Sequence, residues 1–159
     1  MPQTQTDWSL ILRGNIALLW CQWSTRPENR DRSMGQVLDD FLKEYRNVSP
    51  FNPGLLLMAS YILFVYPQQA EFEAINFLRI DTDKFIVHQG TPNTDKKRFC
   101  SRIRNGLTHA RFTVNGDQIE LCDKKKDGTD QFRSTISVGD FGNFINGFMH
   151  EVKNQHFER

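Results

Sequence analysis

Two periodicities meet in residues 111–152, RFTVNGDQIELCDKKKDGTDQFRSTISVGDFGNFINGFMHEV. In the first part, apolar residues alternate with polar ones in three short runs, as in strands that bury one face. Asn115-Gly116 between the first two runs is typical of a type I′ hairpin turn, and KKKDGTD forms the second connection. The sequence therefore predicts a β-meander over about residues 111–137, with alternating positions at Phe112, Val114, Ile119, Leu121, Phe132, Ser134 and Ile136.

The second part has the period of an amphipathic helix. Ser137, with Asp140 three residues later, forms a variant of the capping box, which marks the start of a helix. We expect this last helix to pack an apolar stripe on the core, because apolar residues recur at Phe141, Phe144, Ile145, Phe148, Met149 and Val152.

Helical patterns also dominate the sequence before residue 111. Helices are predicted over residues 9–23, after an N-cap at Ser33, over residues 54–66 and 70–79, and from Asn93 or Thr94 to about Ala110. Residues 80–93 have no clear pattern and stay unassigned. The expected fold class is therefore mainly α, with a small β-hairpin or meander inserted before the last helix.

Length and composition fit one soluble domain. The 159 residues lie in the single-domain range and 38% are hydrophobic, so we expect residues 1–159 to form a single domain with a core. The apolar run at residues 54–66 is shorter than the roughly 20 residues that a membrane span needs. Three cysteines without a CxxC pair, and an N-terminus without the pattern of a signal peptide, indicate a cytoplasmic protein with no membrane partner.

Charge is unevenly distributed along the chain. Lys and Arg number 20 and Asp and Glu 19, so the formal net charge is +1. Residues 96–111, KKRFCSRIRNGLTHAR, nevertheless hold six basic residues and no acidic one, which leaves −5 for the rest of the chain. Such a segment is typical of a phosphate-binding surface, although a solvated helix face has the same pattern. The six are Lys96, Lys97, Arg98, Arg102, Arg104 and Arg111.

Helical geometry divides this basic segment into two faces. At about 100° per residue, the apolar stripe that faces the core consists of Phe99, Ile103, Leu107 and Ala110. Asn105 and His109 share the opposite side, with Arg98 and Arg102 alongside. Histidine can act as acid or base near neutral pH, and arginine holds phosphate through paired donors. Without a carboxylate cluster, these residue types suit metal-independent cleavage of RNA, in which the ribose 2′-OH is the nucleophile.

The run Arg104-Asn105-Gly106-Leu107-Thr108-His109 resembles the Arg-polar-x-x-x-His signature of the HEPN superfamily. Its position on a late helix, before a last amphipathic one, agrees with this resemblance. The resemblance implies a helical up-and-down bundle that forms a homodimer and acts as a metal-independent endoribonuclease without a cofactor. RNA would be the substrate, in a bacterial toxin, defence or stress system, and an antitoxin protein is a second partner that the resemblance allows.

The resemblance also implies roles for individual residues. Arg104 would contact the scissile phosphate, Asn105 would be the polar second position, and His109 would be the acid/base group. Attack of the 2′ oxygen on the neighbouring phosphorus would leave a 2′,3′-cyclic phosphate and a 5′-OH. The surrounding basic residues would bind RNA phosphates, namely Lys96, Lys97, Arg98, Arg102 and Arg111.

Two features depart from the family pattern. A subgroup of HEPN toxins carries a tyrosine two residues after the histidine, as a target of regulatory nucleotide addition, and this chain has Arg111 there. Arg104 and His109 are also about 140° apart on an ideal helix, whereas Arg102 is better aligned with His109. We expect Arg104 to be the primary phosphate contact and Arg102 an accessory one.

Two other functions stay open at this point. The chain could be a HEPN-like module that binds RNA or a nucleotide without cutting, or a structural or regulatory bundle whose basic helix binds an acidic partner protein. Among the remaining candidates, His88 gets no role, His150 and His156 are interpreted as surface residues, and Cys100 as a small boundary residue. Lys124-Lys125-Lys126 is interpreted as a solvated turn that could extend a nucleic-acid surface.

Overall fold

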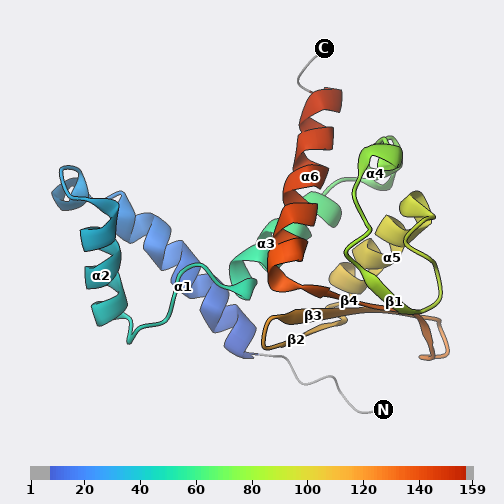
Figure 1. Cartoon of the computed structure of the whole chain (residues 1–159), viewed down its shortest axis with the longest axis horizontal. Coiled ribbons are helices and arrows are strands. Elements are labelled where there is room, and N and C mark those ends of the chain that lie inside the picture. Colours follow the sequence, from blue (N-terminus) through green and yellow to red (C-terminus); the bar gives the residue numbers. More distant parts are fainter. Residues whose placement is uncertain (1–7, 157–159) are drawn as a thin grey trace. The chain divides into compact units, whose positions relative to one another are not determined.

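The computed structural model describes residues 8–156, with side chains for residues 12–155 (Figure 1). Its α-helices are α1 (Trp8–Ser24), α2 (Met34–Glu44), α3 (Pro53–Phe64), α4 (Gln69–Glu73), α5 (Lys96–Thr108) and α6 (Val138–His156). Its strands are β1 (Ile86–Gln89), β2 (Phe112–Asn115), β3 (Gln118–Lys124) and β4 (Asp130–Ser137). Two short 3₁₀ helices lie at Pro27–Asn29 and Phe77–Arg79. No described helix is long and apolar enough to cross a membrane.

The chain forms two compact units, the first ending at Met58 and the second beginning at Ala59. In the first unit, Ser33 starts α2 through the predicted cap, because its hydroxyl accepts from the Gln36 N–H and the Gln36 side chain accepts from the Ser33 N–H. Aromatic packing joins α1 to α2, with the Trp20 and Phe41 ring centres 5.2 Å apart. The single domain expected from chain length stays a prediction.

The second unit is built on an antiparallel sheet of strand order β1-β4-β3-β2. The three strands of the predicted meander are confirmed, and Asn115 pairs with Gln118 across the predicted turn. The structure adds β1 from the unassigned residues 80–93, paired with β4. This strand escaped prediction because it has only four residues, three of them exposed, and therefore lacks a clear alternation of apolar and polar residues.

One face of the sheet is buried, and α5 and α6 lie over it (Figure 1). From β3, Ile119 and Leu121 are fully buried, and from β4 so is Phe132, whose ring centre lies 5.3 Å from that of Phe99 in α5. The stripe of α6 packs as predicted at Phe141, Phe144, Ile145 and Phe148, and the ring of Phe148 stacks on that of Phe64 from α3 at 4.1 Å. The prediction is wrong for Met149, which is 47% exposed because it lies about 80° around the helix from Phe141, at the edge of the stripe. The core between the helices and the sheet is therefore rich in phenylalanine.

The predicted mainly helical fold with a small β insertion is confirmed, but the up-and-down bundle is not. In the second unit the long helices pack on a sheet rather than only on one another. The predicted helix at residues 70–79 is also divided into α4 and a 3₁₀ helix. The division occurs at Asn76, whose backbone is not helical and whose side chain accepts from the Leu78 N–H to start the second piece.

Candidate functional site

Helix α5 carries the basic segment and presents the two predicted faces. Asp95, rather than Asn93 or Thr94, caps its start by accepting from the Arg98 N–H at 3.4 Å. Its core-facing side chains are buried as predicted at Phe99, Ile103 and Leu107. Ala110 was also expected in this stripe but is exposed, because α5 ends before it and its φ is +50°.

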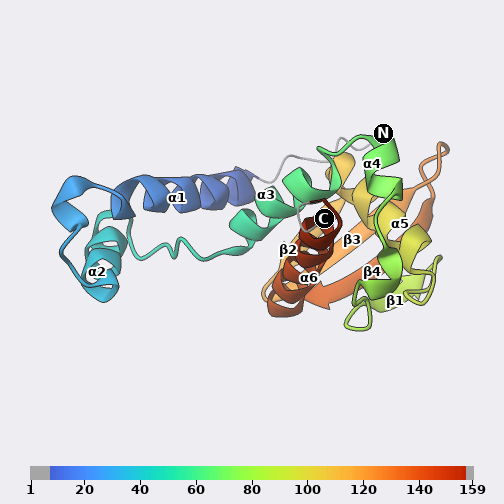
Figure 2. The same ribbon diagram turned by 90° about the horizontal axis from the view of Figure 1, so that it is seen from above.

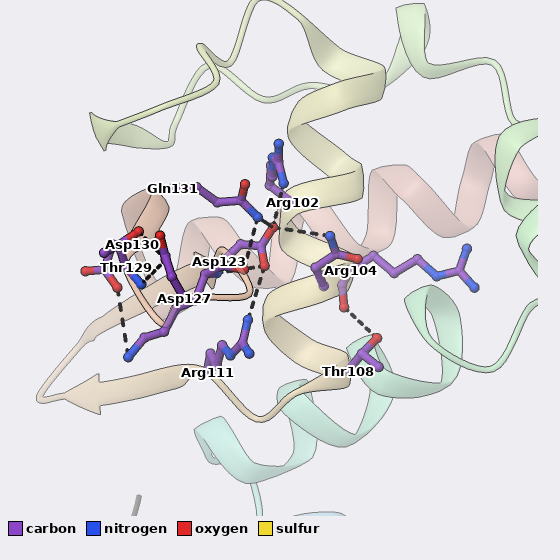
Figure 3. Close-up of polar contacts among 11 residues, drawn as sticks. Arg102, Arg104, Thr108, Arg111, Asp123, Asp127, Thr129, Asp130 and Gln131 are labelled. Atoms are coloured by element: carbon purple, nitrogen blue, oxygen red, sulfur yellow. Dashed lines mark hydrogen bonds and ion pairs between the residues drawn. The ribbon is translucent and has the colours of Figure 1, made fainter. Parts of the chain in front are cut away.

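A buried carboxylate organises the polar side of α5 (Figure 3). Asp123 at the end of β3 is 2% exposed. Its Oδ2 accepts from Arg102 Nη1 at 2.8 Å, Asn105 Nδ2 at 3.2 Å and Gln131 Nε2 at 2.9 Å. Its Oδ1 accepts from Arg111 Nη1 at 3.3 Å and from the Lys124 N–H at 2.8 Å. The structure thus brings together three of the predicted site residues, Arg102, Asn105 and Arg111.

The hydrogen bonds to Asp123 define what this carboxylate can do. Two carboxylate oxygens offer about four lone-pair sites, and five donors already occupy them. Asp123 therefore has no free lone pair with which to take a proton from a substrate. Its role is to hold the two guanidinium groups and the amide at fixed positions, through strong charge-assisted hydrogen bonds.

Sequence reasoning overlooked Asp123, although a signal for it exists. Ile119 and Leu121 are inward positions of β3, and continuing their alternation by two residues puts position 123 on the same face. That face lies under α5, so an acidic residue there meets the basic segment. Residues 96–111 contain no carboxylate of their own, but the folded site does contain one.

Arg104 lies apart from this network. Its guanidinium donates to the Pro67 carbonyl at 2.7 Å and to Gln69 Oε1 at 2.9 Å, and it stands 4.7 Å from the centre of the Phe72 ring. These contacts direct the side chain toward α4, which lies beside α5 in Figures 1 and 2. The structure therefore does not bring Arg104 together with the Asp123 network, and its side chain points away from the His109 side of α5, in line with the angle of about 140° between Arg104 and His109 on an ideal helix.

His109 occupies the C-cap of α5, where its side chain is exposed. The Arg111 N–H donates to the Gly106 carbonyl at 2.7 Å and the Ala110 N–H to the Leu107 carbonyl at 3.1 Å. This is the hydrogen-bond pattern of a Schellman motif, which ends the helix and turns the chain into β2. The His109 N–H still donates to the Asn105 carbonyl at 3.1 Å, so these two residues remain one helical turn apart.

The remaining basic residues lie at the start of α5. The Lys96 ammonium donates to the Leu78 carbonyl at 3.2 Å, whereas Lys97 and Arg98 have exposed side chains. Arg98 lies one turn before Arg102, on the same side of the helix as Asn105 and His109. The polar strip, as we call Arg98, Arg102, Asn105 and His109, therefore runs along the whole of α5.

The other nucleophile and histidine candidates lie outside the polar strip. Cys100 is fully buried rather than at a boundary, and burial raises the pKa of its thiol to about 12 despite the nearby Lys96. His88 on β1 is within 2.9 Å of Thr135 Oγ1, and His150 on α6 is 3.3 Å from the Asn154 amide. The His156 side chain lies outside the described ones. Over residues 8–156, no group of three or more His, Cys, Asp and Glu could hold a metal ion.

Comparison with known proteins gives one match. The model of a protein family described as HEPN pEK499 p136 matches residues 16–159. No curated protein and no solved structure matches the chain. The match covers nearly all of the described chain, including α5 and Asp123.

Proposed function

This chain belongs to the HEPN pEK499 p136 family, and from this premise we propose that it is a metal-independent endoribonuclease of a bacterial toxin, defence or stress system. HEPN domains are often ribonucleases, which makes RNA the first substrate class to test. The observation that carries the proposal is the polar strip, in which the exposed His109 lies one turn from Asn105 and on the side of Arg102.

In the proposed reaction, His109 handles a proton and the arginines bind the phosphate. The ribose 2′-OH loses its proton as its oxygen attacks the neighbouring phosphorus. The bond from phosphorus to the 5′ oxygen breaks, and that oxygen takes up a proton. The products are a 2′,3′-cyclic phosphate and a 5′-OH. Because base and acid act on opposite sides of the phosphorus, a homodimer in which two copies of His109 face each other would supply both groups.

The arginine that contacts the scissile phosphate is proposed to be Arg104, as in the family signature, with Arg102 as accessory. The contacts within one chain favour a larger share of phosphate binding for Arg102, because it lies on the His109 side of α5. Arg104 is instead hydrogen-bonded to Pro67 and Gln69. Arg104→Ala and Arg102→Ala separate the two assignments. An inactive Arg102→Ala protein beside an active Arg104→Ala protein would transfer the primary role to Arg102.

The decisive experiment is incubation of the purified protein with single-stranded RNA in EDTA. We expect cleavage to survive the chelator and to fall at least 100-fold in His109→Ala, the loss expected for a general acid/base. Product ends should be 2′,3′-cyclic phosphate and 5′-OH. His150→Ala is a matched control, because His150 is an exposed histidine on α6 and should leave cleavage unchanged. Cleavage that persists in His109→Ala would refute the mechanism.

A second candidate function is RNA or nucleotide binding without cleavage. It is favoured by Arg104, because the signature arginine is held by two hydrogen bonds and an aromatic ring of α4. In that case the wild-type protein would bind RNA without cutting it, and His109→Ala would bind equally well. Absence of both binding and cleavage at low salt, where phosphate contacts are strongest, would refute both functions.

The homodimer and an antitoxin partner belong to the same proposal. Solution mass should be twice the monomer mass of 18.6 kDa. Mixing His109→Ala and wild-type chains tests the shared site, because a dimer with one His109 should lose activity out of proportion to the fraction of mutant chain. Activity that falls only in proportion would show that each chain acts alone.

A further inference from the structure

A basic pocket adjoins the first half of α5, away from Arg104 and His109. It has a volume of about 310 Å³, at the lower end of the range for ligand sites. The pocket is open to solvent between α5, the loop after β1 and the turn between β3 and β4. Its lining residues are Gly90, Thr91, Pro92, Arg98, Arg102, Lys125 and Gln131.

Three of these lining residues are cations that lack full neutralisation. Within residues 8–156, the side chains of Arg98 and Lys125 make no hydrogen bond or ion pair. Arg102 donates a hydrogen bond from Nη1 to Asp123, but its buried Nε has no hydrogen-bond partner among the described atoms. Asp127 is close enough to Lys125 for the two charges to attract, but its carboxylate accepts hydrogen bonds from Thr129. Like charges around a concave surface, of which only Arg102 is in an ion pair, attract an anion that bridges them.

The walls of the pocket are held in place before any ligand arrives. The φ of Gly90 is +87°, and a Cβ there would overlap the Gln131 carbonyl oxygen, so the loop packs directly on β4. Three residues after Gly90, the Asn93 amide donates to the Thr82 and Phe85 carbonyls at 3.2 and 3.3 Å. Asp123 fixes both Arg102 and Gln131 from below. A pocket with fixed donors binds at a lower entropic cost than a flexible one.

We propose that this pocket binds a phosphate group, with Arg98, Arg102 and Lys125 as its ligands. The group is either a backbone phosphate of an RNA strand or the terminal phosphate of a strand or nucleotide. The inference deepens the proposed function. Arg98 and Arg102 lie about 16 and 10 Å from His109 along the helix axis, at 1.5 Å per residue. A strand that occupies the pocket would therefore be anchored a few nucleotides from the bond at His109.

The proposal requires that three side chains bind one phosphate group at a defined place, rather than that positive charge acts diffusely. The lysine run Lys124-Lys125-Lys126 in the turn allows these two possibilities to be separated. Lys125 lines the pocket, whereas its neighbour Lys126 is also exposed but does not line it. Arg98→Ala and Lys125→Ala remove pocket ligands, and Lys126→Ala removes the same charge beside them. All three residues have exposed side chains, so we expect each variant to fold.

Binding of a fluorescent single-stranded RNA to the catalytically inactive His109→Ala chain measures the pocket without cleavage. In that background, we expect Arg98→Ala and Lys125→Ala each to raise Kd at least fivefold and the pair at least tenfold, with less than a twofold change for Lys126→Ala. Oligonucleotides with a 5′-phosphate or a 5′-OH distinguish a terminal phosphate from a backbone phosphate as the bound group. A preference for the 5′-phosphate indicates a terminal group, and equal affinity indicates a backbone phosphate.

Two results would overturn the proposal that this pocket binds a phosphate group. Equal losses for Lys125→Ala and Lys126→Ala would mean that charge acts without a defined site. Absence of binding both of RNA and of adenosine monophosphate at low salt would mean that no phosphate is held there. Failure of the nuclease proposal looks different, because then RNA is bound with the predicted pocket dependence but is not cut by the protein that retains His109.

Discussion

One carboxylate holds two polar side chains of α5, Arg102 and Asn105, together with Arg111 just after the helix. Asp123 is almost fully buried, while its partners Arg102 and Arg111 keep 20% and 29% of their side-chain surface exposed. The buried Asp123 carboxylate thus compensates the charges of Arg102 and Arg111 from inside the protein, while both guanidinium groups still face solvent on their outer side. A site of this kind keeps its arginines in place without using up all of their donors.

Removal of the Asp123 charge should destabilise the fold. We expect Asp123→Asn to lower the free energy of unfolding by about 2–3 kcal/mol, below the usual cost of breaking a fully buried pair because the arginines stay partly solvated. Urea unfolding measures this. Asp127→Asn is the control, since Asp127 is exposed in the turn and should change stability by no more than about 0.5 kcal/mol. Equal effects of the two substitutions would contradict the role of Asp123.

Burial should also make Cys100 inert. Its pKa is raised to about 12, so the thiol stays protonated well above neutral pH, and reagents cannot reach it. At pH 8 we expect an alkylating reagent to modify the exposed Cys21 in the native protein and Cys100 only after denaturation. Peptide mass spectrometry reads the two sites separately. Modification of native Cys100 at the rate of Cys21 would refute its place in the core.

At the scale of elements, the end of α5 carries a local strain. Ala110 adopts the left-handed conformation that a Schellman motif usually gives to glycine. The cost of this conformation for an L-residue is about 1–2 kcal/mol. Ala110→Gly should therefore raise the free energy of unfolding by about 1 kcal/mol, less the entropy that glycine adds to the unfolded chain. A loss of stability in thermal unfolding would argue against this helix end.

The contact of α5 with β3 depends on Gly106. A Cβ at this position would lie 2.7 Å from the Cys122 carbonyl oxygen, which is backbone and cannot move aside. We expect Gly106→Ala to cost about 1–3 kcal/mol, as in other overpacked cores. Gly147→Ala on α6 meets nothing within 4 Å and should instead stabilise its helix by about 0.5–1 kcal/mol. Similar effects at the two glycines in chemical unfolding would contradict the close packing.

The sequence predicts those elements whose residues repeat at a fixed period. The stripes of α5 and α6 and the alternation of β3 and β4 are long enough to reveal both the elements and their buried faces. Arg104 shows where such reasoning stops, because one of its partners is the Pro67 carbonyl, a backbone group that every residue possesses. The pocket is equally invisible in the sequence, since the loop at Gly90 and the turn at Lys125 meet α5 only after folding.

For the whole molecule, segregated charge predicts how binding depends on salt. Each phosphate contact with a single strand contributes a slope of about −0.7 to the logarithm of affinity against the logarithm of salt concentration. Three to four contacts along the polar strip and pocket then give a slope of about −2 to −3 for RNA, despite a net charge of only +1. Lys125→Ala should make the slope less negative by about 0.7, one contact's share. A salt-independent affinity would exclude a phosphate-based interface.

The sheet of the second unit has short strands at both edges. The outer strands β1 and β2 have four residues each, whereas the inner strands β3 and β4 have seven and eight, and the pairing of β1 is irregular between Val87 and Gln89. Short, irregular edges offer few free backbone groups in register for another strand. The fold therefore protects itself against edge-to-edge aggregation, and a second copy that docks on this protein would do so through side chains rather than by extending the sheet.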